Sequence, residues 1–268
     1  MNHKARWVVS LTAIMQFLVA AAIILWATNC PAQNATSASQ TNSPQLSKND
    51  LIEKVSAATN AKDWKQVEEL CQQLVALEPA NWSFLGGLAN AQLQQGKYDD
   101  AAKAYDKAVT LALAEKSDTP LTPEKIKARN AAIGKMLTGQ GNAYLKLKKI
   151  DDAVRSYYRA ADLDPNPGLA YFNLCATLYN TGNVDGAVSA CDKAIAADPT
   201  RADAYFIKGS LLVAGAKTSE DGRVVPPPGT VEALQKYLAL APDGPHAKDV
   251  KDMLVYVGAD VPATQNTK

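Results

Sequence analysis

Residues 134–167 read GKMLTGQGNAYLKLKKIDDAVRSYYRAADLDPNP, and residues 168–200 read GLAYFNLCATLYNTGNVDGAVSACDKAIAADPT. The second stretch repeats the first at an offset of 34 residues, so small and aromatic residues return at fixed places. Self-similarity at this period predicts a chain built from repeated pairs of helices. The matching pairs are Ala153 with Ala187, Tyr157 with Cys191, Ala160 with Ala194 and Pro165 with Pro199.

Within one unit, the residue pattern predicts two helices that lie face to face. Small residues on the shared faces let the two backbones approach closely, and the proline near the end of the unit cannot continue a helix. Because a single helical hairpin cannot bury both of its faces, the units are expected to stack on one another. The residues that share a face are Leu137, Gly141 and Tyr144 in the first helix, and Ala153, Tyr157 and Ala160 in the second.

These units resemble the tetratricopeptide repeat (TPR) family, whose unit is a helix–turn–helix of this length. The resemblance implies an all-α, right-handed superhelical solenoid. The stretch from Val224 to Leu254, with the units before it, also resembles exported bacterial TPR proteins, which supports an envelope location but implies no activity. The expected repeats cover about residues 48–81, 82–113, 134–167, 168–201 and 202–242, the first of them degenerate.

Two insertions interrupt the repeats. The first covers residues 114–133 and contains Thr122-Pro123, a helix N-cap followed by a proline that suits the first helical position. We expect one long helix over about 123–147, or two helices broken near Gly134. The second insertion covers residues 215–229 and contains Asp221-Gly222, which predicts a protruding loop or a small β-hairpin.

The C-terminal part is expected to end in a capping helix. Thr230 is predicted to cap a helix over residues 231–240, and Asp243 to cap a last helix over residues 245–257. The tail over residues 259–268 is expected to be disordered.

The first 32 residues have the pattern of an export segment. Lys4 and Arg6 precede an uncharged stretch over residues 7–26, and cleavage is expected after Ala32. The stretch is long enough to cross a bilayer, so an uncleaved anchor is an alternative, as is a lipoprotein modified at Cys30. In each case residues 33–47 are expected to form a flexible linker to the repeats. The repeats are then expected to be periplasmic or secreted, or to face the periplasm while anchored to the inner membrane. Membrane contact is expected only through residues 7–26, if the export segment is not cleaved.

Composition argues against several classes of function. The 268 residues carry a formal charge of +1 and no cluster of Lys and Arg, which argues against nucleic acid as a partner. His246 is the only histidine outside the export segment, so a histidine-based metal cluster is excluded. The paired carboxylates Asp99-Asp100 and Asp151-Asp152 are expected to open second helices, where they interact favourably with the helix dipole. We predict no catalytic residues, no metal and no cofactor.

The family resemblance implies that a protein or peptide partner binds the concave face formed by the first helices. In the family subclass that binds chaperones, basic residues hold the C-terminal carboxylate of the partner. Such residues are missing here, because the fifth residue of each of four repeats is Gly86, Thr138, Phe172 or Phe206. The face is therefore expected to be neutral with aromatic patches. Alternatively, its aromatic residues pack between units as core. The expected contact residues are Asn90, Thr138, Asn142, Phe172, Asn173, Tyr179 and Phe206, with Leu93 and Leu145 beside them.

The cysteines form no CxxC motif, so this metal and redox signature is absent. Cys175 and Cys191 lie on the facing helices of one unit. They can form a disulfide in an oxidising compartment if their Cα atoms lie within about 7 Å of each other. The alternative is that both are small, buried core residues.

The sequence therefore predicts a non-catalytic scaffold or adaptor of the bacterial envelope that binds an unidentified partner protein. An alternative is a periplasmic chaperone-like holder or an accessory subunit of an exported enzyme. An adaptor should co-purify with defined partners at a fixed ratio, whereas a holder should suppress the aggregation of many unfolded chains.

Overall fold

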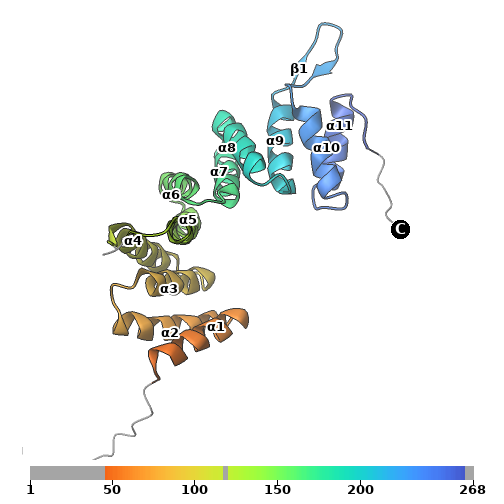
Figure 1. Cartoon of the computed structure of the whole chain (residues 1–268). Helices are drawn as coiled ribbons and strands as arrows, with labels where there is room; N and C mark the ends of the chain where they lie inside the picture. The colour runs from red at the N-terminus through yellow and green to blue at the C-terminus, as the bar shows by residue number, and fades with distance from the viewer. Residues whose placement is uncertain (1–45, 117–119, 263–268) are drawn as a thin grey trace, which may run out of the picture. The chain divides into compact units, whose positions relative to one another are not determined.

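The computed structural model describes residues 46–116 and 120–262 (Figure 1). The expected export segment, nearly all of the linker and the end of the tail lie outside these residues. By its contacts the chain divides after residue 45, and the described residues belong to the part that begins at Leu46. Within the ranges 46–116 and 120–262, no helix combines the length and the apolar character that a membrane span requires.

The described residues form an all-α solenoid in which helix pairs stack in sequence order, with one small β-hairpin (Figure 1). The pairs are α1 with α2, α3 with α4, α5 with α6, α7 with α8 and α9 with α10, and α11 packs on the last pair. The helices are α1 (Lys48–Asn60), α2 (Trp64–Leu77), α3 (Trp82–Gln94), α4 (Tyr98–Ala114), α5 (Pro123–Lys146), α6 (Ile150–Leu163), α7 (Gly168–Asn180), α8 (Val184–Ala197), α9 (Ala202–Ala214), α10 (Thr230–Leu240) and α11 (Ala247–Tyr256), and the strands are β1 (Lys217–Thr218) and β2 (Val224–Val225).

Small residues allow the two helices of a pair to approach closely. A Cβ atom added to Gly141 would lie 2.5 Å from a ring carbon of Tyr157, so glycine is required where α5 meets α6. Alanines at the corresponding contacts are completely buried. Close packing of this kind makes each interface sensitive to a single added methyl group. These alanines are Ala89, Ala101, Ala108, Ala153, Ala160, Ala187 and Ala194.

The turn inside four of the helix pairs contains one residue with a positive φ at the same place in the unit. This residue is Gly96 in α3–α4 and Gly182 in α7–α8, with φ of 79° and 75°. It is Lys62 in α1–α2 and Lys148 in α5–α6, with φ of 57° and 60°. Glycine adopts this left-handed conformation freely, whereas a side chain with a Cβ atom is strained there.

The first insertion lengthens α5 at its start instead of adding a separate helix. Thr122 accepts a hydrogen bond from the backbone N–H of Lys125 at 3.4 Å and so caps the helix, as expected. The helix continues through Gly134 without a break. Arg129 donates to the carbonyl oxygens of Ala112 and Glu115, which ties the added turns to the end of α4.

The second insertion forms the expected β-hairpin, in which Lys217 pairs with Val225 and Thr218 with Val224 in antiparallel register. The two predicted caps that follow are wrong. Gly229, with φ of 84°, precedes α10, and Thr230 is the first helical residue. Its hydroxyl donates to the carbonyl oxygen of Pro227 at 2.6 Å instead of accepting from the helix.

Asp243 does not cap the last helix, because α11 begins later than expected. The residue before α11 is His246, whose backbone N–H donates to the hydroxyl of Tyr237 at 3.0 Å. This hydrogen bond fixes the connection to α10 and moves the helix start from residue 245 to Ala247. The helix ends at Tyr256, one residue before the expected end.

Candidate functional site

The residues expected to contact a partner all lie on first helices of the helix pairs: α3, α5, α7 and α9. We call this surface the inner face. Asn90, Asn142, Asn173, Phe172 and Phe206 are half-buried there. Thr138 is buried and Tyr179 is exposed, so the seven residues differ in how far a partner can reach them.

Asn142, Asn173 and Tyr157 form a connected polar group at the interface of α5, α6 and α7. The Oδ1 atom of Asn142 accepts a hydrogen bond from the Tyr157 hydroxyl at 2.7 Å and another from Asn173 Nδ2 at 3.4 Å. Burial raises the pKa of Tyr157 to about 12, so its hydroxyl stays protonated and remains a donor at neutral pH. The orientation of the Asn142 amide is therefore fixed from its oxygen side.

The amide nitrogen of Asn142 makes no hydrogen bond to any residue in the described ranges. Asn142 is one of the residues that line a shallow hollow of about 260 Å³ between α3, α4 and α5. Leu93 and Leu145 supply apolar walls, and Tyr98 and Lys146 supply further polar groups. Such a hollow can hold one side chain of a ligand while the amide donates to a carbonyl or carboxylate oxygen.

Sequence reasoning missed part of this hollow. Lys146 and Gln94 stand at the thirteenth position of their units, which the repeat pattern places on the inner face, so position alone could have identified them. Tyr98 begins a second helix, and nothing in the repeat pattern places it beside Asn142. Thr138, which was expected to contact a partner, is only 8% exposed and lies below the surface.

Phe172 and Phe206 are half-buried and pack against one core cluster whose members come from α6, α7, α8 and α9. Phe172 packs against the core of α7 and α8, and the guanidinium of Arg201 lies 5.2 Å from its ring centroid. Phe206 stacks on the imidazole of His246 with centroids 3.8 Å apart and an angle of 4° between the planes. The ring of His246 therefore covers Phe206, and the aromatic patch expected on α9 is partly closed.

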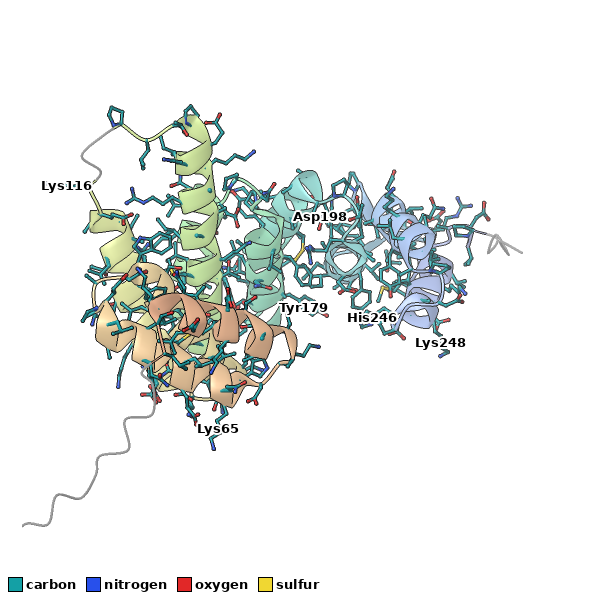
Figure 2. The ribbon with its side chains drawn as sticks, turned by 60° about the horizontal axis from the view of Figure 1, so that its bottom comes forward. Lys65, Lys116, Tyr179, Asp198, His246 and Lys248 are labelled. Carbon is teal, nitrogen blue, oxygen red and sulfur yellow. A yellow bond between two sulfur atoms is a disulfide. The ribbon has the colours of Figure 1, made fainter. Side chains whose placement is uncertain are left out.

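Tyr179 is the most exposed of the expected contact residues, at 38%, and stands near the end of α7 (Figure 2). Lys146 makes no ion pair with any residue in 46–116 or 120–262. The accessible part of the inner face thus extends from α3 to α7, with amide, hydroxyl and ammonium donors among aliphatic and aromatic groups.

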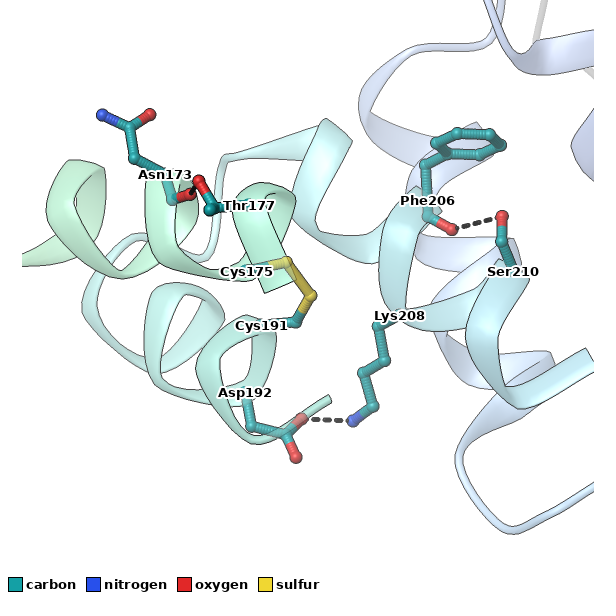
Figure 3. The surroundings of a disulfide bond; sticks show 8 residues. All are labelled: Asn173, Cys175, Thr177, Cys191, Asp192, Phe206, Lys208 and Ser210. Carbon is teal, nitrogen blue, oxygen red and sulfur yellow. Dashed lines mark hydrogen bonds and ion pairs between the residues drawn. A yellow bond between two sulfur atoms is a disulfide. The ribbon is translucent and has the colours of Figure 1, made fainter. Parts of the chain in front are cut away.

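The structure joins Cys175 and Cys191 by a disulfide between α7 and α8 (Figure 3). Their Cα atoms are 5.0 Å apart, and both residues are completely buried. Figure 3 shows the disulfide below Asn173 and Thr177 of α7, so it fastens the helix that carries Asn173 to its partner helix.

The remaining candidates from the sequence were the paired aspartates. Asp99-Asp100 and Asp151-Asp152 lie in the first turns of α4 and α6, as expected. Among the described residues, no three side chains of His, Cys, Asp or Glu come together in a way that could hold a metal ion.

Comparison with known proteins places this arrangement among repeat proteins. The sequence model of the tetratricopeptide repeat family matches residues 63–117 and 138–202. The crystal structure of YrrB, whose title describes a TPR protein with an unusual peptide-binding site, is 19% identical, with a TM-score of 0.54, and covers 76% of this chain and 91% of its own. A crystal structure of MamA is also 19% identical, with a TM-score of 0.54, and covers 70% of this chain and 94% of its own. At these identities the two structures show the fold alone.

A curated relative is similar over part of its length. Hsp70-Hsp90 organizing protein 2 of Arabidopsis thaliana is 23% identical over 208 residues, which cover 58% of this chain and 36% of the relative. The chain therefore spans about a third of the length of the curated relative it matches.

Proposed function

We propose that this chain, whose residues 63–117 and 138–202 match the sequence model of the tetratricopeptide repeat family, is a non-catalytic scaffold that binds an extended segment of a partner protein on its inner face. The observation that carries the proposal is the Asn142 amide: its oxygen accepts from Tyr157 and Asn173, its nitrogen has no hydrogen-bond partner among the described residues, and the residue lines the hollow. A donor fixed in this way suits the backbone carbonyl of a peptide, because the amide is oriented before the ligand arrives.

The surroundings of Asn142 support a peptide over a small polar ligand. Leu93 and Leu145 offer apolar contact for one side chain of the peptide, and Tyr98 and Lys146 add donors around it. Lys146 favours a segment that brings a carbonyl or an acidic group to this point. Because His246 covers Phe206, the bound segment extends from α3 to α7 and ends before α9.

The related structure of YrrB, described in its title as having a peptide-binding site, agrees with this kind of ligand. The name of the curated relative refers to the organisation of two chaperones, which is consistent with a scaffold that brings proteins together.

We further propose that the protein acts in the bacterial envelope, in the periplasm or attached to the outer side of the inner membrane. The disulfide between Cys175 and Cys191 supports this location, because structural disulfides persist in oxidising compartments. The uncharged stretch over residues 7–26 also supports this location, because such a stretch is typical of export and anchoring segments.

The variant Asn142→Asp tests the binding site with little change in shape. An aspartate still accepts from Tyr157 and Asn173, but it replaces the amide N–H donor by a carboxylate oxygen that repels carbonyl groups. Asn166→Asp is the matched control, because Asn166 is exposed in the turn between α6 and α7.

The measurement is chemical crosslinking in the producing cells, followed by quantitative mass spectrometry of the purified complexes. We expect one partner at a fixed ratio with the wild type and with Asn166→Asp, and at least about a tenfold loss with Asn142→Asp. Full recovery of the partner by Asn142→Asp would place binding elsewhere. Recovery of many unrelated unfolded chains would instead favour the chaperone-like holder.

A further inference from the structure

A second hollow, of about 530 Å³, lies between α8, α9 and the base of the β-hairpin. We call it the outer hollow, because its main wall is α8, a second helix of its pair. Val184, Val188, Leu212 and Pro227 give it apolar walls, and Val184 is 49% exposed. It shares no residue with the hollow beside Asn142.

Two local departures from the repeat create the outer hollow. The first residue of α8 is Val184, whereas the corresponding residues of α2, α4 and α6 are Trp64, Tyr98 and Ile150. Val184, the smallest of these four residues, is one of the residues that line the hollow. The insertion after α9 then supplies Pro227 as a further wall, so the hollow depends on the segment that interrupts the repeats.

Most charges around the outer hollow already have partners. Lys208 pairs with Asp192 at 2.6 Å, and the ammonium of Lys193 lies 5.4 Å from the centroid of the Tyr171 ring. Asp185 differs, because its carboxylate forms no ion pair with any residue that the structure describes. The hollow therefore combines apolar walls with one carboxylate that is available to a cation.

The β-hairpin offers the complementary chemistry. It projects from the helices that carry it (Figure 1). Val225 is 53% exposed, and the side chain of Arg223, two residues earlier, is 84% exposed. Among the residues that the structure describes, Arg223 forms an ion pair with Asp221 of the same hairpin alone, at 3.1 Å, and so exposed a pair is easily exchanged for another. Within the described part of the chain, each strand also has one edge without a strand partner, a feature that invites contact with another chain.

We propose that the outer hollow receives the β-hairpin of a second copy of this chain. Val225 of one copy packs against Val184 of the other, and Arg223 pairs with Asp185 across the interface. Because the hairpin and the hollow are neighbours on one molecule, a two-fold axis between them generates both contacts at once. The result is a closed dimer that leaves the hollow beside Asn142 free in each copy.

The test is the association constant of the purified protein, measured by sedimentation equilibrium. We expect a reversible dimer for the wild type. Asp185→Arg places like charges opposite each other twice in a symmetric dimer, so it should weaken association by at least about tenfold, or about 1.4 kcal/mol. Arg223→Asp should have the same effect, and the double variant Asp185→Arg/Arg223→Asp should restore the dimer.

Asp151→Arg is the matched control, because Asp151 is an exposed acid in the first turn of α6, one repeat before Asp185. It changes the net charge and the helix terminus equally and should leave association unchanged. A wild-type protein that stays monomeric at the highest concentration it tolerates overturns the proposal, as does a double variant that fails to dimerise. An equal loss in Asp151→Arg also overturns it, since general charge would then explain the effect.

Discussion

The disulfide between Cys175 and Cys191 should account for a large part of the stability of the repeat that carries Asn173. The two residues are separated by 16 positions along the chain and close a loop that contains the turn between α7 and α8. Closing a loop of this length restricts the unfolded chain and is expected to stabilise the native state by about 3 kcal/mol. Both sulfurs are buried, so the bond is shielded from reductant until the repeat opens.

The perturbation is reduction of the disulfide, or its removal in Cys175→Ala/Cys191→Ala. Urea unfolding of the wild type, followed by circular dichroism, should shift to lower urea when reductant is added. The double variant should start at the lower stability and show no response to reductant. Cys71 does not complicate the measurement: burial raises its pKa to about 11, and the thiolate is the form that exchanges.

Three results would contradict this reasoning. Coincident unfolding curves with and without reductant would show that the bond does not stabilise the repeat. A response to reductant in the double variant would point to another thiol. Two free thiols at positions 175 and 191, found by labelling the denatured protein without reductant, would show that the bond is absent, and they would remove the main support for an oxidising location.

Three further predictions concern the packing of the repeats. Lys148→Gly should raise the free energy of unfolding by about 0.5–1 kcal/mol in urea titration, because glycine adopts a φ of 60° without strain, and an unchanged value would contradict this. Gly141→Ala should lower it by about 1–3 kcal/mol, since the added methyl group meets the Tyr157 ring; wild-type stability would show that the helices separate easily. The pKa of Glu68 lies below its ordinary 4.5: burial alone raises it, but the hydrogen bond from Lys97 helps to outweigh burial. Wild type should therefore exceed Glu68→Gln in stability at neutral pH and lose that advantage as the pH falls through the lowered pKa, whereas a pH-independent difference would refute the assignment.

The repeat architecture could be predicted from sequence because it rests on local and periodic signals. Gly141 and Tyr157 hold fixed positions of the 34-residue unit, and the equivalent positions of the next unit hold Cys175 and Cys191; the structure places Gly141 against Tyr157 and joins the two cysteines. Thr122-Pro123 identified the start of α5, because capping depends on a few neighbouring residues. The Asp221-Gly222 pair marked the hairpin for the same reason.

One local backbone conformation and the contacts between distant residues could not be predicted in this way. Thr230 has the right residue type for a cap, but Gly229 adopts the left-handed conformation before it and turns its hydroxyl toward Pro227. Phe206 was expected on an open face, and only the docking of α11 brings His246 over its ring. Amide orientation at Asn142 likewise depends on the Tyr157 hydroxyl from another helix.

Site-specific photo-crosslinking in the producing cells tests the proposed scaffold function most directly. A photoreactive amino acid at Gln94 lies on the wall of the hollow beside Asn142, and the same group at Lys65, exposed on α2, serves as the control. We predict that Gln94 captures one partner protein in high yield and that Lys65 does not. No product from Gln94, or the same products from both positions, would contradict the claim that the inner face is the binding site.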